Sequence, residues 1–221
     1  MTAPAARDLR ALADRAARLV RPGRRAVLGI TGEPGAGKTT LARDLVDLLA
    51  GSPPPGCAPG SWVAHVPMDG FHLADVELHR LGRSGRKGAP DTFDAAGYGA
   101  LLDRLRDPLA DEVVYAPAFD RDIEQPVAGS IPVHPECRLV VSEGNYLLLE
   151  ASPWPRVRTC FDEVWFCELG GDERRRRLVE RHVRFGKDRA AAEAWVQATD
   201  EPNAELVRRH RHAADLVVDA A

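Results

Sequence analysis

The segment Gly32–Thr39 (GEPGAGKT) constrains the fold more than any other part of the chain. It lies between an apolar run at 26–31 and a stretch of helical periodicity at 39–50. It matches the pattern G-x-x-x-x-G-K-[ST], in which glycines let backbone N–H groups turn toward phosphate oxygens. The helix that follows directs its positive end at the same point. The segment therefore predicts a strand, a phosphate-binding loop (P-loop) and a helix in succession, with a nucleotide as ligand.

Within this loop, Lys38 is expected to contact the β- and γ-phosphates, and Thr39 is expected to bind Mg²⁺. Lysine is rare here, since Lys38, Lys87 and Lys187 are the only lysines among 30 basic residues. A lysine inside the motif therefore indicates that a compact charge is needed. The residues predicted to contact the phosphates are Gly32, Glu33, Pro34, Gly35, Ala36, Gly37, Lys38, Thr39 and Thr40.

Apolar runs alternate with helical periodicities along the rest of the chain. Further strands are predicted at 62–67, 138–142, 163–167 and 216–219, and helices at 9–19, 98–106, 172–184, 189–198 and 203–212. This alternation is typical of a mainly parallel sheet covered on both faces. A chain of 221 residues suits one domain. We therefore predict an α/β, doubly wound P-loop NTPase fold with a helical lid, forming a single domain over 1–221.

Two segments interrupt this pattern. Glycines and a proline crowd 71–96, which predicts a long functional loop. The second segment, 116–133, begins with a turn-rich stretch at 116–129, and the short runs at 113–115 and 131–133 could form a small excursion around it. Both segments are expected to be insertions that bind the phosphate acceptor, while the lid is expected within about 172–189.

Charge and cysteine usage limit the partners. The formal net charge of -3 supplies no basic field for nucleic acid. The four cysteines are scattered without a C-x-x-C pair, and we expect free thiols in a reducing compartment. No secretory segment and no run of roughly 18 apolar residues is found. We expect a cytoplasmic protein without membrane or nucleic-acid partners, and a homodimer as the default oligomer.

Two carboxylates follow predicted strands. Asp69 comes after the strand at 62–67, and Glu143 after the strand at 138–142. Ligands of doubly wound sheets lie beyond the carboxyl ends of strands, so Asp69 is placed to accept the proton of an attacking hydroxyl. A turn or helix-cap aspartate is the simpler alternative. Glu143 is expected to hold Mg²⁺, directly or through water, or to assist at the acceptor hydroxyl. The chain has neither an N-K-x-D motif nor an apolar run that ends in Asp as an ordinary Walker B strand does.

Five segments together resemble the phosphoribulokinase, uridine kinase and pantothenate kinase family of P-loop kinases. They are Gly32–Thr39, Met68–His72, Arg86–Asp94, Pro117–Arg121 and Glu143–Tyr146. The D-G-F-H and K-G-x-P-x-x-F-D elements are most similar to bacterial pantothenate kinase and to a bacterial subgroup of nucleoside or fructose-transport kinases. The resemblance implies that Asp69 is the catalytic base, that Glu143 lies near the metal and the acceptor hydroxyl, and that an arginine-bearing lid closes over ATP. The predicted catalytic residues are Asp69, Lys38 and Glu143.

The acceptor is less well defined by this resemblance. The chain lacks the aromatic-rich pattern of a uridine kinase and is shorter than is usual for bacterial pantothenate kinase. The residues predicted to bind the acceptor are His72, Lys87, Asp120, Arg121 and Tyr146. For His72, Lys87 and Arg121, a structural or solvated role is the alternative.

The arginine-rich helix at 172–184 supplies the predicted lid. Arg177, Arg181 and Arg184 fall near one face of this helix and are the candidates to bind ATP. Most arginines of this segment are expected to be solvated. Asn203 follows Pro202 and is expected either to cap the next helix or to line the nucleotide pocket.

The function predicted from these residues is an ATP- and Mg²⁺-dependent kinase. It would transfer the γ-phosphate to a hydroxyl of a small metabolite, which could be a sugar, a nucleoside or a pantothenate-like compound. Two alternatives remain at this point: an ATP-binding regulatory module, and an ATPase or nucleotide switch that depends on a protein partner.

Overall fold

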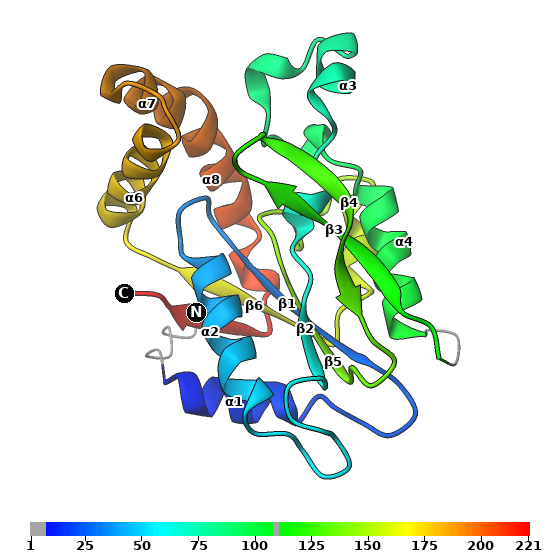
Figure 1. The fold of residues 1–221 in the computed structure, drawn as a ribbon. Helices are drawn as coiled ribbons and strands as arrows, with labels where there is room; N and C mark the ends of the chain where they lie inside the picture. The colour runs from blue at the N-terminus through cyan, green and yellow to red at the C-terminus, as the bar shows by residue number, and fades with distance from the viewer. Residues whose placement is uncertain (1–7, 108–110) are drawn as a thin grey trace.

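The computed structural model describes residues 8–107 and 111–221. Its main sheet has five parallel strands in the order β2-β5-β1-β6-β7, with β1 at the centre (Figure 1). The strands are β1 (Ala26–Gly32), β2 (Val63–His65), β5 (Leu139–Glu143), β6 (Glu163–Glu168) and β7 (Leu216–Asp219). The predicted mainly parallel sheet is therefore confirmed.

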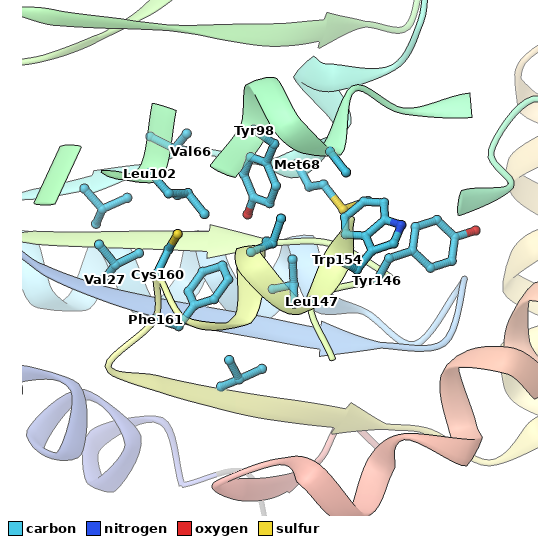
Figure 2. Close-up of a cluster of buried hydrophobic side chains, with 14 of the residues drawn as sticks. Val27, Val66, Met68, Tyr98, Leu102, Tyr146, Leu147, Trp154, Cys160 and Phe161 are labelled. Carbon is cyan, nitrogen blue, oxygen red and sulfur yellow. The ribbon is translucent and has the colours of Figure 1, made fainter. Parts of the chain in front are cut away.

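Two apolar cores lie on opposite faces of this sheet, because successive side chains of a strand point to opposite sides. In β1, Val27 joins one core and Leu28 joins the other. Helices α1 (Leu9–Ala17) and α2 (Lys38–Ala50) contribute to the core around Leu28, and helices α4 (Ala95–Arg106), α5 (Trp154–Arg158) and α8 (Glu201–Arg209) contribute to the core around Val27. Figure 2 shows the core around Val27, with Leu102 of α4 and Phe161 close to the strand.

Three short helical segments lie in the stretch 71–96 that was predicted to be a loop, and a fourth ends at its first residue. They are η1 (Met68–Phe71), α3 (Asp75–Arg80), η2 (Ser84–Arg86) and η3 (Pro90–Thr92). None exceeds six residues, so none spans enough turns to show a periodicity. Helix α4 then begins at Ala95, three residues before the predicted start, because the Asp94 side chain accepts a hydrogen bond from the Gly97 N–H at 2.8 Å.

An antiparallel hairpin, β3 (Val114–Asp120) and β4 (Gln125–Val133), replaces the turn-rich segment expected at 116–129. Proline is unfavourable inside a strand because it has no N–H to donate to the ladder. Pro117 is accommodated because the register shifts between Ala116 and Ala118, and a bulge is where a strand tolerates a missing N–H. Because this sheet consists of the two strands β3 and β4, each strand also has one edge without a neighbouring strand. Pro126 and Pro132 need no N–H to donate toward such an edge.

The last helices form one run. Helix α6 (Gly171–Arg184) is followed by α7 (Arg189–Trp195), a π-helical turn at Val196–Asp200, and α8. Asn203 is therefore not an N-cap, because the turn before it is already helical and Pro202 lies in the first turn of α8. Asn203 is buried at 8% exposure within the helix.

The sheet edge at the carboxyl ends of the strands is flanked by two raised parts. Helix α3 and the β3–β4 hairpin stand on one side of it, and α6 and α7 stand on the other (Figure 1). None of the helices described within 8–107 and 111–221 has the length and apolarity needed to cross a membrane. The four cysteines form no disulfide with one another, as predicted.

A buried hydroxyl pair ties α4 to the end of β5. The Tyr98 hydroxyl lies 2.6 Å from the Ser142 Oγ, and Ser142 in turn donates to the Val66 carbonyl. We expect Ser142→Ala to lower the free energy of unfolding by about 1–3 kcal/mol, since it leaves the Tyr98 hydroxyl without its partner. Tyr98→Phe should cost about 1 kcal/mol. Urea unfolding of the double variant should show a cost below the sum of the two, and strict additivity would contradict the pairing.

Candidate active site

The loop between β1 and α2 is packed too tightly for side chains at two glycines. A Cβ on Gly32 would approach the Cys167 carbonyl oxygen of β6 to 2.3 Å. Gly35 has a φ of +82°, and a Cβ there would lie 2.7 Å from Leu178 of α6. Helix α2 starts at Lys38, directly after the left-handed Gly37. The loop backbone therefore curls around the positive end of α2, as a phosphate site requires.

Lys38 is held inside this loop. Its side chain is buried, and its Nζ donates a hydrogen bond to the Glu33 carbonyl at 2.9 Å. Burial lowers the pKa of Lys38, against the opposing attraction of Glu143. A buried ammonium has a strong need for an anionic partner. Of the loop residues predicted to contact phosphate, Pro34, Gly35, Lys38 and Thr39 line a cavity, whereas Thr40 is exposed outside it.

Thr39 and Glu143 meet at the floor of this cavity. The Thr39 hydroxyl donates to Glu143 Oε1 at 3.0 Å. Burial, together with the charge of Asp69, raises the pKa of Glu143 to about 7, although Lys38 opposes the shift. His65 lies 3.9 Å from the same oxygen, but burial lowers its pKa to about 4, so it adds no charge at neutral pH.

This pair of oxygens fits a hard divalent cation. A hydroxyl and a carboxylate are ligands that Mg²⁺ accepts, and a cation would compensate the buried acid that Lys38 only partly balances. The residues that would hold the metal are thus Thr39 and Glu143, the two predicted from the sequence.

Asp69 lies in η1, just beyond β2. Its Oδ2 accepts a hydrogen bond from the Arg121 guanidinium at 2.7 Å. Burial would raise the pKa of Asp69, but the positive charges of neighbouring groups, Arg121 and Lys38 among them, outweigh it, and the pKa lies below its ordinary value. The pKa values of Asp69 and Glu143 are therefore driven apart, which is how a site assigns different roles to two carboxyl groups. Asp69 is ionised at neutral pH and competent as a base.

A cavity of about 610 Å³ joins these groups. Its floor is formed by the P-loop, Asp69 and Glu143, and its walls come from α3, the hairpin and α6. Three of the predicted acceptor-binding residues, His72, Lys87 and Arg121, line it. Lys87 is paired with Asp75 at 2.6 Å. Other lining residues were not among the predicted site residues: Asp75, Glu124, Asn145, Trp195 and Asp200.

Two predicted acceptor-binding residues do not reach the cavity. Tyr146 has 0% exposure, packs against Phe93 and Trp154, and donates its hydroxyl to the Gly88 carbonyl. Figure 2 shows Tyr146 beside Trp154 in the apolar core. Asp120 closes the hairpin turn by accepting from the Asp122 N–H at 2.8 Å. Both therefore act on the structure around the cavity and not on a ligand inside it.

The three α6 arginines are not equivalent. Arg181 lines the cavity, and no hydrogen bond or ion pair engages its guanidinium within the part of the chain that the structure describes. Arg177 lies 3.7 Å from the position that a Cβ on Gly37 would take, and it pairs with Glu173 at 2.7 Å. Arg184 is exposed outside the cavity lining. Arg177 and Arg181 thus flank the phosphate-binding loop, and Arg184 does not.

The Glu33 side chain points away from the cavity and anchors the P-loop to the last helices. It pairs with Arg174 of α6 at 3.0 Å and with Arg208 of α8 at 2.7 Å. Arg174 has 0% exposure, also pairs with Glu201, and donates to the Pro34 carbonyl at 3.2 Å. Its position four residues before Leu178, on the buried face of α6, was the signal that could have singled it out.

A P-loop at the carboxyl ends of a parallel sheet, facing an ionised carboxylate across one cavity, defines a P-loop kinase site. The comparisons with known proteins agree. The chain is 33% identical to a candidate uridine kinase of Schizosaccharomyces pombe, over 94% of this chain and 88% of that protein. It is 38% identical to an ATP-dependent kinase-like protein of Aspergillus versicolor, over 65% of this chain and 88% of that one. No model of a known protein family matches the chain.

Among solved structures, one described as a candidate fructose transport system kinase from Silicibacter aligns with a TM-score of 0.84. It is 36% identical, and the alignment covers 95% of this chain and 98% of that one. The chain belongs to the uridine kinase-like family of P-loop kinases. The resemblance drawn from the sequence motifs is therefore confirmed, and the protein is a P-loop small-molecule kinase.

The buried charge of Arg174 provides a test of the P-loop anchor. We expect Arg174→Met to lower the free energy of unfolding by about 3–5 kcal/mol, because it leaves Glu33 and Glu201 with one cation fewer in a buried place. Arg176→Met, at an exposed position of the same helix, serves as the matched control and should leave the urea midpoint unchanged. Equal midpoints for both variants would show that Arg174 does not anchor the loop.

The raised pKa of Glu143 predicts how stability depends on pH. Without Mg²⁺, folded Glu143 holds its proton up to about pH 7, whereas the unfolded chain loses it near 4.5. The free energy of unfolding of the parent, compared with that of Glu143→Gln, should therefore fall as the pH rises from 4.5 to 7, by a total on the order of 3 kcal/mol. Above pH 7 the difference should stay constant.

Chemical unfolding in EDTA across this pH range measures the difference. Added Mg²⁺ should stabilise the parent and not the variant at pH 8. A difference between the two proteins that does not vary with pH would contradict the burial argument.

Proposed function

We propose that the protein transfers the γ-phosphate of ATP to a hydroxyl group of a small metabolite. The observation that carries the proposal is that the ionised carboxylate of Asp69 and the P-loop Lys38 line one cavity. A base on one side and a phosphate cradle on the other match in-line transfer to an incoming hydroxyl.

In this mechanism the loop Gly32–Thr39 binds the triphosphate, and Lys38 neutralises charge on the transferring group. Thr39 and Glu143 would hold Mg²⁺, which when bound offsets the charge of the β- and γ-phosphates. Arg181, whose guanidinium lines the cavity and has no partner among the described residues, would add a cation beside the leaving group.

Asp69 would take the proton of the acceptor hydroxyl. Arg121 forms an ion pair with Oδ2 of Asp69 at 2.7 Å, which holds the carboxylate in place. The other carboxylate oxygen is not engaged by this ion pair. Walls of polar and aromatic side chains suit an acceptor with several oxygen atoms, and a sugar, a nucleoside and a pantothenate-like compound all stay within this class. A cytoplasmic location and a homodimer remain part of the proposal.

ADP release measured with Mg-ATP and a panel of sugars, nucleosides, hydroxy acids and pantothenate tests the proposal. We expect turnover that depends on one class of acceptor. Asp69→Asn should lower kcat by about 10²- to 10⁴-fold, because the variant lacks the base. Asp172→Asn, at a fully exposed carboxylate of α6, is the control and should match the parent.

Slow hydrolysis that no acceptor stimulates, at the same rate in parent and Asp69→Asn, would overturn the proposed function. An activity that appears only with a protein partner would favour the ATPase alternative.

A further inference from the structure

The imidazole ring of His72 is fixed on three sides. It packs against the tilted rings of Phe93 and Phe119, with ring centroids 4.0 Å and 4.6 Å away. Its Nδ1 lies 2.8 Å from the backbone carbonyl oxygen of Asp69. The backbone of His72 also pairs with that of Phe93 as an isolated β-bridge. Of the two ring nitrogens, Nε2 is therefore the one that no hydrogen bond engages within the described part of the chain.

The contact with the Asp69 carbonyl decides which ring nitrogen carries the hydrogen. A carbonyl oxygen can only accept, so Nδ1 must be the donor. Burial lowers the pKa of His72, although Asp69 opposes the shift, and the ring is neutral at pH 7. In a neutral ring with Nδ1 protonated, Nε2 presents a lone pair and cannot donate.

This Nε2 has no partner among residues 8–107 and 111–221, although His72 lines the cavity. It is not sealed from solvent either, in contrast to His65 Nε2. An acceptor atom that faces a ligand cavity without a partner is available to a donor on the ligand.

A role as catalytic base is less suited to this nitrogen. A proton on Nε2 would make a cation next to Arg121 and Lys87, whose charges already lower the pKa of His72. Asp69, by contrast, is stabilised as an anion by Arg121 and Lys38. The two side chains of this turn thus have different roles: Asp69 takes protons, and His72 only accepts hydrogen bonds.

We propose that His72 Nε2 accepts a hydrogen bond from a second hydroxyl of the acceptor substrate, near the hydroxyl whose proton Asp69 takes. This inference rests on the proposed function and narrows its substrate class to compounds with two neighbouring hydroxyl groups. The ring of His72 is hydrogen-bonded to the backbone carbonyl of Asp69 itself. A substrate that contacts both side chains must therefore present its two hydroxyl groups a few bonds apart. His72 is then a specificity-determining residue.

The test compares each active polyhydroxy compound of the panel with its analogue that lacks the neighbouring hydroxyl. The parent should prefer the complete compound by about 10- to 100-fold in kcat/KM, because the analogue leaves Nε2 unpaired. His72→Phe keeps the stacking but has no lone pair, and it should turn over both compounds at the lower rate. His72→Gln, with an oxygen near the place of Nε2, should restore part of the preference. The KM for ATP should stay unchanged in both variants.

His212→Phe is the matched control, because His212 makes the same kind of Nδ1 contact, at 3.0 Å to the Arg209 carbonyl, on the exposed surface. It should keep the full preference of the parent. Equal rates of the parent with both compounds, or a preference that survives in His72→Phe, would overturn the proposal.

A second measurement separates this proposal from the proposed function. Nitrogen-15 NMR of the imidazole rings, assigned through the loss of one signal set in His72→Phe, should show Nδ1 protonated and Nε2 unprotonated at pH 7 without ligand. A proton on Nε2 would contradict the inference, whatever the result of the kinase assay. If the tautomer is as expected but no acceptor is turned over, the proposed function fails first, and the second-hydroxyl contact fails with it.

Discussion

The parallel pairing of β1 with β5 determines where the chemical groups of this protein can meet. Its register sets Ile30 opposite Glu143, so the carboxylate at the end of β5 lies beside the loop that follows β1. Thr39 and Glu143, which are 104 residues apart in the sequence, can therefore hydrogen-bond. Because β2 pairs with β5 in the same direction, Asp69 emerges at this edge too. The position of a site of this kind is therefore set by the direction of the strands, whichever side chains they carry.

Electrostatics then divides the work among groups that the sheet brings together. Two carboxylates in one buried place cannot both ionise without cost. Asp69 is surrounded by cations and keeps its charge, whereas Glu143 is buried deeper and holds its proton until a cation balances it. The P-loop is kept in shape by a separate set of charges, since Glu33 turns outward to Arg174 and Arg208. The loop, α6 and α8 are thereby linked by a buried ion cluster.

Much of this arrangement could be predicted where local sequence carries the physics. The loop Gly32–Thr39 is a contiguous motif, and Asp69 and Glu143 were found because each follows an apolar run. The β3–β4 hairpin extends well into the stretch that was predicted to be turn-rich, and only the bulge at Pro117 and the free edges explain how its prolines are accommodated. The structure also corrected Tyr146, since an aromatic residue next to a motif fits a core as well as a cavity.

The sequence by itself determined the phosphate-binding loop, the alternation of strands and helices, and hence the family. These follow from contacts among neighbouring residues, which a local pattern records. Only the tertiary structure decided which side chains share the cavity, why Arg174 is buried while Arg184 is exposed, and which nitrogen of His72 is free. Such properties depend on burial and on partners distant in the chain, and both exist only once the sheet has assembled.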